Sequence, residues 1–403
     1  MRILLKNCPD DILIEDRIIS KIGKDINTDA DKVIDCKGLY VSSGFVDLHC
    51  HLREPGFEYK EKISTGTHAA AAGGFTAVVA MANTKPVCDN VDTVSFILNE
   101  ANQNGYCKVY PVAAVTKGFK GEELTNFEEL KRAGVRVFSD DGVPVENALM
   151  MKNAIIEANK QGVIVVSHCE EPVRAENEWK NPKSSEIIMV ARECILAKET
   201  NCHIHIAHVS CKESVEIIRS YKKMGAKITA ETCPHYFSLT AKDVEKYGTN
   251  AKMNPPLCDE EDRMAIIEGL VDGTIDAIST DHAPHSEAEK QKGLFDAPNG
   301  ITGLETALGV SITYLYKTGY LSLEEICRKL SANPCSILGI DHSIKEGNIA
   351  NITVFDAHKK YTFDKSKSLS LGRNTPYDSF ELYGKNMLTI SDGIITYNEI
   401  IGG

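Results

Sequence analysis

The sequence predicts an α/β protein: a (β/α)8 TIM-type barrel joined to a small β-sandwich-like domain that both termini form. Two observations support this prediction. Between about residues 45 and 340, eight short apolar runs alternate with segments of helical periodicity, and eight such units are the number that a (β/α)8 barrel requires. On either side of this region, short strand-like segments follow one another with no long amphipathic helix among them.

Both ends of the chain alternate apolar and polar residues, as half-buried strands do. The strand-like segments are residues 3–6, 11–15, 17–23, 350–357, 359–364, 386–393 and 394–400. We therefore assign residues 1–44 and 343–403 to the small β domain and residues 45–342 to the barrel. His342 and His358 lie near the second terminal region, and we expect both on the surface.

The central region supplies the strands and helices of the barrel. Its apolar runs are residues 45–51, 75–82, 108–115, 135–140, 163–168, 203–209, 227–233 and 276–282. Helical periodicity is clearest at residues 145–161 and 211–225, and the second of these segments ends at a glycine, a common helix stop. A doubly wound open sheet is the alternative. That fold favours a Gly-rich phosphate loop after an early strand, and the sequence has none.

Composition excludes several classes of function. The 403 residues include 45 Lys and Arg against 57 Asp and Glu, a formal charge of −12, which argues against binding to nucleic acid or to an anionic membrane. No run reaches the ~18 apolar residues of a membrane span. The 13 cysteines without a secretory signal predict reduced thiols in a cytoplasmic protein. Because the formal charge of the chain is negative, an anionic substrate would need local cations in its binding site.

Five of the eight apolar runs end in residues that commonly bind metals. The five endings are Asp47-Leu48-His49-Cys50-His51, Ser139-Asp140-Asp141-Gly142, Ser167-His168-Cys169-Glu170, His205-Ile206-Ala207-His208 and Thr280-Asp281-His282. The carboxyl ends of barrel strands meet at one rim, where active sites of this fold lie. Packing alone explains one such His, but not five strands with the same kind of ending.

The alternation of side chains along a strand narrows the choice of ligands. His49 and His51 are two residues apart, so both can face one metal ion. Asp141 shares its parity with Val137 and is mildly favoured over Asp140.

The same reasoning applied to the sixth strand selects one of three histidines. Ile204 and Ile206 share their parity with His208, whereas His203 and His205 have the opposite parity. If the apolar residues face the barrel interior, His208 is the ligand. His203 and His205 are then expected to face the helical layer.

Imidazoles with carboxylates form a nitrogen and oxygen site that suits Zn²⁺ and accepts Mn²⁺, Co²⁺ or Fe²⁺. Four histidines and two aspartates exceed the needs of one tetrahedral ion, and two ions bridged by one carboxylate would use them all. A metal centre of this kind activates water and polarises a carbonyl group. The expected chemistry is metal-assisted hydrolysis of an amide-like bond.

Motifs along the whole chain resemble those of the zinc-dependent cyclic amidohydrolases and, more narrowly, the bacterial long-chain (type I) dihydroorotases. The motifs are DLHCHLREPG at 47–56, MANTKP at 81–86, FSDDG at 138–142, SHCEE at 167–171, HIAHVS at 205–210, ETCPH at 231–235, KMNPP at 252–256, STDHAPH at 279–285 and APNGITGLET at 297–306. Many relatives bridge their metals with a carboxylated Lys on the fourth strand. Residues 135–141 contain no Lys, so the resemblance implies that Asp141 is the residue that bridges the two metal ions.

The resemblance implies a role for each matching position. The implied ligands are His49, His51 and Asp281 for the more buried ion, His168 and His208 for a second ion, and Asp141 between the two. Asp281 is also the implied general base. The implied contacts to the substrate carboxylate are Arg53, Asn83 and His285, and those to the ring amides are Asn254 and the backbone at Asn299 and Gly300. Relatives often have an aromatic residue where Asn299 stands, which weakens the case for a side-chain role there.

The resemblance also implies the activity and its alternatives. The implied reaction interconverts L-dihydroorotate and N-carbamoyl-L-aspartate in pyrimidine synthesis, with one or two zinc ions per subunit. A dihydropyrimidinase-, hydantoinase- or allantoinase-like enzyme is one alternative, and substrate charge separates the two because Arg53 favours a carboxylate. The other is an inactive structural partner of aspartate carbamoyltransferase, which would be expected to lack metal ligands. A homo-oligomer is expected, and a complex with aspartate carbamoyltransferase is plausible.

Overall fold

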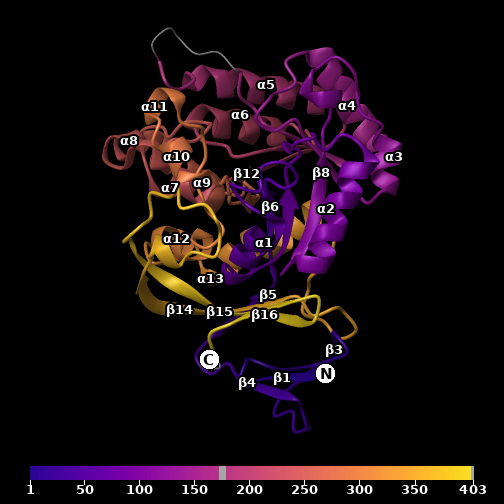
Figure 1. Cartoon of the computed structure of the whole chain (residues 1–403), viewed down its shortest axis with the longest axis vertical. Helices are drawn as coiled ribbons and strands as arrows, with labels where there is room; N and C mark the ends of the chain where they lie inside the picture. Colours follow the sequence, from indigo (N-terminus) through magenta and orange to yellow (C-terminus); the bar gives the residue numbers. More distant parts are fainter. Residues whose placement is uncertain (172–177, 401–403) are drawn as a thin grey trace.

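The computed structural model describes residues 1–171 and 178–400. At its centre, eight parallel strands form a nearly closed barrel, as predicted (Figure 1). In chain order they are β6 (Phe45–Cys50), β7 (Phe75–Ala80), β8 (Lys108–Ala113), β9 (Val137–Phe138), β10 (Ile164–Ser167), β11 (Ile204–Ile206), β12 (Ile228–Thr232) and β13 (Ala277–Ile278). Each pairs with the next, and a bridge between Cys50 and His282 joins the two ends of the sheet.

Helices surround the barrel. They are α1 (Ile63–Ala72), α2 (Val91–Asn104), α3 (Phe127–Arg132), α4 (Ala148–Gln161), α5 (Lys183–Thr200), α6 (Lys212–Lys223), α7 (Pro234–Ser238), α8 (Ala241–Tyr247), α9 (Glu260–Val271), α10 (Glu287–Lys290), α11 (Gly293–Asp296), α12 (Ala307–Ser311), α13 (Leu323–Cys327) and α14 (Asn333–Leu338). Short helical turns are η1 (Lys117–Phe119), η2 (Gly248–Ala251), η3 (Ile312–Tyr316), η4 (Arg328–Ala332) and η5 (Lys365–Lys367). The two helices predicted most clearly correspond to α4 and α6.

Local sequence explains where these helices begin and end. Side chains of Asn90, Asn126 and Asn147 accept hydrogen bonds from the first backbone N–H groups of α2, α3 and α4. Helix α4 ends at Gly162, which has a φ of 64° and so takes the left-handed conformation that glycine adopts at little cost. No helix in the described ranges is long and apolar enough to cross a bilayer.

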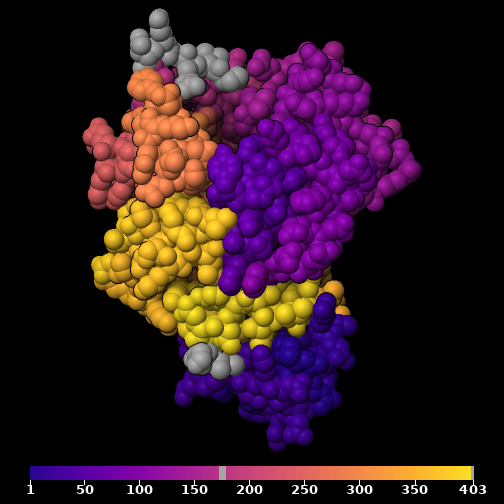
Figure 2. Space-filling model, in the orientation of Figure 1, coloured from indigo at the N-terminus to yellow at the C-terminus, as the bar shows by residue number. Residues whose placement is uncertain are grey.

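Both termini contribute to a β-sandwich, also as predicted. One sheet has the order β3-β2-β1-β4 and the other β16-β15-β14-β5. Their strands are β1 (Arg2–Lys6), β2 (Asp11–Glu15), β3 (Ile18–Gly23), β4 (Lys32–Asp35), β5 (Tyr40–Ser43), β14 (Ile352–Thr362), β15 (Glu381–Ser391) and β16 (Ile394–Asn398). Ile3, Ile14 and Ile34 of the first sheet pack with Ile352 and Ile390 of the second in one buried cluster. Figures 1 and 2 show this unit below the barrel, where N- and C-terminal segments lie together.

The sandwich contacts the barrel near the start of β7. The Thr353 hydroxyl donates to the backbone oxygen of Gly74, and the Thr389 hydroxyl donates to that of Ala71. His342 was expected on the surface, but it is buried, and its Nδ1 lies 3.2 Å from the Thr76 hydroxyl. His358 is exposed. We propose domain boundaries at residues 44–45 and 342–343, where the chain passes between the sandwich and the barrel.

Candidate metal centre and adjoining cavity

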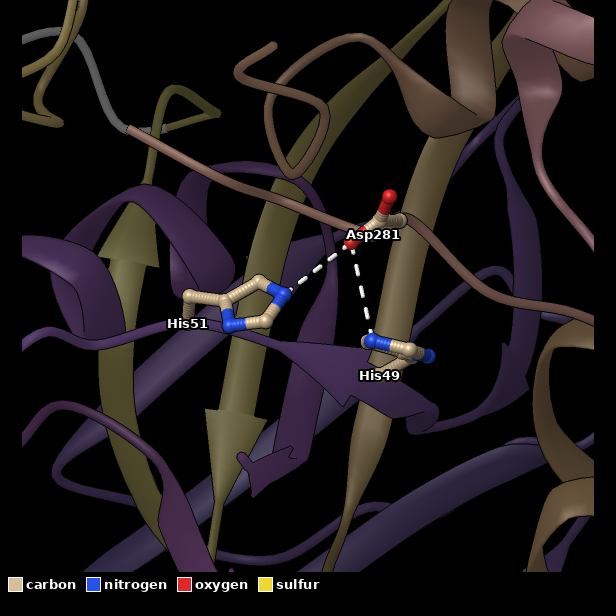
Figure 3. Close-up of side chains that lie close together, drawn as sticks. All are labelled: His49, His51 and Asp281. Atoms are coloured by element: carbon tan, nitrogen blue, oxygen red, sulfur yellow. Dashed lines mark hydrogen bonds and ion pairs between the residues drawn. The ribbon is translucent and has the colours of Figure 1, made fainter. Parts of the chain in front are cut away.

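Six buried side chains from five strand ends come together at the rim of the barrel. They are His49 and His51 at the end of β6, Asp141 after β9, His168 after β10, His208 after β11 and Asp281 after β13. Two groups of three have the spacing that could hold a metal ion: one of His49, His51 and Asp281, the other of His49, Asp141 and His208. Figure 3 shows both imidazoles of the first group directed at the Asp281 carboxylate.

Distances in the first group match those between ligands of one ion. Asp281 Oδ1 lies 3.1 Å from His51 Nε2 and 3.5 Å from His49 Nε2. Two ligand atoms about 2.1 Å from a tetrahedral ion are about 3.4 Å apart. His49 Nε2 is buried and makes no hydrogen bond within the described part of the chain, although carboxylate oxygens lie nearby. These residues therefore fit a metal ion better than they fit a hydrogen-bond network.

Asp141 lies between the first group and the two remaining histidines. Its Oδ1 is 3.3 Å from His49 Nε2, 3.3 Å from His168 Nδ1 and 3.6 Å from His208 Nε2. Its Oδ2 is 3.4 Å from His51 Nε2. One carboxylate thus contacts all four imidazoles, as a group that bridges two ions would. The neighbouring Asp140 turns away and accepts hydrogen bonds from Val115 and Thr116.

The imidazoles keep both carboxylates ionised. Burial alone would raise the pKa of Asp141, but His49, His168 and His208 lower that pKa well below its usual value. Burial likewise opposes ionisation of Asp281, yet His51 and His49 bring the pKa of Asp281 down to about 2. At neutral pH, therefore, the site presents two negative oxygen donors to a cation.

Three of the imidazoles contact a second polar group that helps to orient the ring. His51 Nδ1 donates to Asn83 Oδ1 at 2.9 Å, and His49 Nδ1 donates to Glu231 Oε1 at 3.3 Å. His168 Nε2 lies 3.6 Å from Glu170 Oε2. Such contacts fix which nitrogen faces a metal. Glu231 was not among the predicted site residues, although its position near the end of a barrel strand was a usable signal.

His205 was expected to face the helical layer, and this expectation was wrong, although His208 does reach the site. His205 pairs with Thr229, and its Nε2 lies 3.2 Å from the Glu231 carboxylate inside the barrel, so His205 does not face the helical layer. Ile206 pairs with Ser167, which hydrogen-bonds to α5, so it is Ile206 that faces the helices. Residue 208 has a φ of 38°, and this turn brings its side chain inward.

Unusual backbone conformations recur at the site. His208, Asp281 and Arg53 have φ values of 38°, 45° and 63°, a region that residues other than glycine rarely adopt. Such strain persists only where surrounding contacts hold it, and it is frequent at functional sites. At each of these positions the chain turns immediately after, or within a few residues of, a barrel strand.

A small cavity adjoins the histidines and carboxylates. Its volume is about 180 Å³, less than the ~300–1,000 Å³ of drug-sized pockets, and so it suits a small ligand. The cavity is lined by His51, Arg53, Asn83, Asp141, Gly142, His168, His208, Asn254, Asp281, Ala283, His285, Asn299 and Gly300. Every residue expected to contact substrate is in this set. The amide oxygen of Asn299 is buried without a hydrogen-bond partner among the described residues, so its side chain is available to a ligand.

Arg53 supplies the positive charge on one side of the cavity, and His285 lies beside it. The Arg53 Nε donates to the backbone oxygen of Pro284 at 3.2 Å. Burial, together with the nearby charges of Arg53 and Lys60, lowers the pKa of His285 far below its usual value, so the ring is neutral. Lys60 donates to His285 Nδ1, which leaves Nε2–H to donate to the Asn299 backbone oxygen. With its hydrogen on Nε2, His285 cannot accept from Arg53 Nη2, which lies 3.3 Å away, so the Nη1 and Nη2 hydrogens of Arg53 are available to an anionic ligand.

Comparison with known proteins identifies the family. A family model described as dihydro-orotase-like matches residues 38–214. Relatives named Dihydroorotase in Acetivibrio thermocellus and Ruminiclostridium cellulolyticum are 47% and 46% identical to the chain. These matches cover 96% and 95% of this chain, and 95% and 93% of the relatives. The chain belongs to the dihydroorotase family. Membership confirms the resemblance found in the sequence and the expectation of an enzyme.

Solved structures extend the comparison to the fold. The L-hydantoinase (dihydropyrimidinase) from Arthrobacter aurescens has a TM-score of 0.91 at 24% identity, with 98% of this chain and 96% of that chain covered. The dihydropyrimidinase from Brevibacillus agri has a TM-score of 0.87 at 20% identity, with 99% and 96% covered. At these identities the likeness concerns the fold. In sequence, the dihydroorotases match this member of their family much better than the hydantoinases do.

Proposed function

We propose that the protein catalyses the reversible hydrolysis of L-dihydroorotate to N-carbamoyl-L-aspartate, a step in the synthesis of pyrimidines. Family membership supports this reaction, and one observation supports the substrate: Arg53 lines the same small cavity as the histidines and carboxylates. The planar guanidinium pairs well with a carboxylate. L-dihydroorotate bears one, whereas hydantoin and dihydropyrimidine rings are neutral.

The metal in this proposal is Zn²⁺, one or two ions per subunit. The residues that would hold it are His49, His51 and Asp281 in one group, His168 and His208 in another, and Asp141 between them. The donor set of imidazoles and carboxylates supports zinc. When bound, zinc supplies Lewis acidity toward a carbonyl oxygen and lowers the pKa of water.

Asp281 is the proposed general base. Its low pKa makes it a carboxylate at neutral pH, able to accept a proton from the attacking water. As the C–O bond forms and the ring C–N bond breaks, Asp281 returns this proton to the leaving nitrogen. In the proposal, Arg53, Asn83 and His285 hold the substrate carboxylate, while Asn254 and the backbone at Asn299 and Gly300 hold the ring amides.

Substrate charge provides the test of this function. The metal-loaded protein should hydrolyse L-dihydroorotate and leave dihydrouracil almost untouched under the same conditions. Replacing Arg53 with Met should lower kcat/KM for L-dihydroorotate by roughly 10²–10³-fold, because the carboxylate loses a charged, bidentate partner. The exposed Arg136, replaced in the same way, serves as the matched control and should leave kcat/KM within about twofold.

Two results would overturn the assignment. Turnover of dihydrouracil at a rate similar to that of L-dihydroorotate would favour the hydantoinase alternative. No turnover of either compound, with metal bound, would favour a structural partner of aspartate carbamoyltransferase.

We also propose a cytoplasmic homo-oligomer that is able to associate with aspartate carbamoyltransferase. All 13 cysteines are free, which supports a reducing compartment. Exposed apolar side chains on the neighbouring helices α4 and α5, such as Leu149 and Ile195, support self-association. Light scattering of the purified protein, alone and with aspartate carbamoyltransferase, measures both masses.

A further inference from the structure

A second and larger cavity adjoins the first one. Its volume is about 480 Å³, within the usual range for small-molecule sites, and it shares His285 with the first cavity. Helix α10 forms one wall, and the segment that connects β14 to β15 forms another. Figure 2 shows the orange surface around α10 and α11 in contact with the yellow C-terminal surface.

The walls of this cavity are cationic, in a protein whose formal charge is −12. Lys290, Lys365 and Arg373 line it, together with one carboxylate, that of Glu287. Amide groups of Asn250 and Gln291 add further polar surface. The excess of positive charge is local, so it is a feature of this cavity and not of the whole surface.

Lys290 is buried there without a carboxylate partner in the described part of the chain. It is 5% exposed, and its Nζ donates to the backbone oxygens of Pro298 and Gly300 at 3.0 and 2.9 Å. Among the described residues no acceptor meets its third N–H. Burial, and then the nearby Lys252, lower the pKa of Lys290 to about 7, with Glu289 opposing. A buried cation without a counter-charge is costly, and an anion in the cavity would reduce that cost.

The other two cations also have unused donors. Arg373 Nη1 donates to the backbone oxygens of Ser370 and Gly372, while its Nε and Nη2 have no acceptor in the described ranges. Lys365 Nζ is 3.7 Å from the Asp378 carboxylate, a long ion pair that leaves the ammonium able to bind another anion. Three cations from two separate segments therefore present free N–H groups around one cavity.

We propose that this cavity binds a small polyanion bearing phosphate or carboxylate groups. Lys290 would supply a buried ammonium, Arg373 a guanidinium suited to two oxygens, and Lys365 a third positive charge at the mouth. The volume of the cavity admits an organic anion larger than the ligand of the first cavity.

Lys290 also connects this cavity to residues 298–300, of which Asn299 and Gly300 line the first cavity. Pro298 and Gly300, whose carbonyl groups it holds, flank Asn299, and Asn374 donates to the same Gly300 oxygen at 3.0 Å. An anion that draws the ammonium away would loosen Gly300 and change KM for the cyclic substrate. This effect on KM rests on the proposed function, whereas binding of the anion does not.

Calorimetric titration of the metal-loaded protein tests the site. The probes are inorganic phosphate and, for the carboxylate class, tricarballylate. Wild-type protein should bind at least one of them, and the double variant Lys365→Gln/Arg373→Gln should bind it at least about tenfold more weakly. Lys131→Gln/Arg132→Gln removes the same charge from α3, on another side of the barrel, and should bind within about twofold of wild type.

A single variant tests whether weaker anion binding in the double variant comes from loss of structure. Lys365→Glu reverses a half-buried charge whose Nζ makes no backbone contact in the described residues. It should also weaken binding, while the lost ion pair with Asp378 lowers the unfolding temperature by only about 1–3 °C. Bound anion should shift KM for L-dihydroorotate in the wild type but not in the double variant. If the anion fails to bind at about 10 mM, or binds equally to the wild type and the double variant, the proposal is wrong. Absence of L-dihydroorotate turnover would overturn the proposed function and leave the binding result intact.

Discussion

Glu231 connects the candidate metal ligands to polar residues deeper in the barrel. Its carboxylate contacts His49, His205 and the Ser279 hydroxyl, and the His205 Nδ1 lies 2.8 Å from the Thr229 hydroxyl. Burial raises the pKa of Glu231, but His205 and His49 lower it overall, so the group is ionised. A carboxylate on the remote nitrogen of a ligating histidine fixes the ring and makes it a stronger donor.

We therefore expect Glu231→Gln to weaken metal binding by about 10–100-fold, because the amide keeps the shape but loses the charge. Competition with a chelator of known affinity measures this change. Glu305→Gln is the matched control: Glu305 is also largely buried and hydrogen-bonds Ser368 and Leu369, but it contacts none of the candidate ligands. Equal metal affinity in the wild type and in Glu231→Gln would show that the contact with His49 has no effect on the metal.

The residues that the sequence predicted for the site lie close together in the structure, and their roles stay predictions. All the predicted residues except His49 line the first cavity, and His49 contacts Asp141 and Asp281. The prediction that the apolar residues of the sixth strand face the barrel interior was wrong, because the interior also holds polar side chains. Here His205 pairs with Glu231. The positive φ at His208 is a property of tertiary packing that no sequence pattern reports.

At the scale of elements, Gly384 of β15 is a point where the sandwich packs tightly against η3 beside the barrel. Gly384 has a φ of 87°, and a Cβ there would lie 2.2 Å from Ile312 Cδ1 and 2.9 Å from Ile312 Cβ in η3. Gly384→Ala should therefore cost about 2–4 kcal/mol of unfolding free energy, from backbone strain and overpacking together. Urea unfolding measures it.

Gly319→Ala separates the two causes. Gly319 has nearly the same φ, 83°, but open space around it. This variant should lose only about 1–2 kcal/mol, the cost of the backbone conformation. Losses of equal size in the two variants would mean that Ile312 moves aside freely and that the contact between β15 and η3 is not tight.

The elements themselves were predicted to different extents. All eight barrel strands were found from apolar runs, yet β9 and β13 contain only two residues each, because polar strand ends turn early into site loops. Strands β4 and β5 went unnoticed because each has four residues and little apolar alternation. Contacts such as that of His342 with Thr76 join residues far apart in sequence, so local patterns could not place them.

At the scale of the whole molecule, the barrel interior is partly polar, and this makes stability depend on pH. His203 lies immediately before β11, and its Nε2 is 2.8 Å from the Thr229 hydroxyl. Burial, and then the nearby His205, lower the pKa of His203 to about 4; Asp276 opposes them, while Lys222 and Lys227 add to the lowering. An unfolded histidine has a pKa near 6.5. Between pH 6.5 and 4, therefore, the unfolded chain takes up a proton here that the folded chain does not.

This difference makes folding less favourable as pH falls. From pH 7 to pH 5, His203 should remove about 1–2 kcal/mol of unfolding free energy. In His203→Gln the side chain at this position cannot titrate. Between pH 7 and pH 5 the unfolding free energy of this variant should therefore fall by about 1–2 kcal/mol less than that of the wild type. Groups common to both proteins, the candidate metal ligands included, cancel when the two curves are subtracted. His358→Gln, at an exposed site, is the control and should follow the wild type. Parallel curves for the wild type and His203→Gln would show that burial does not keep His203 neutral.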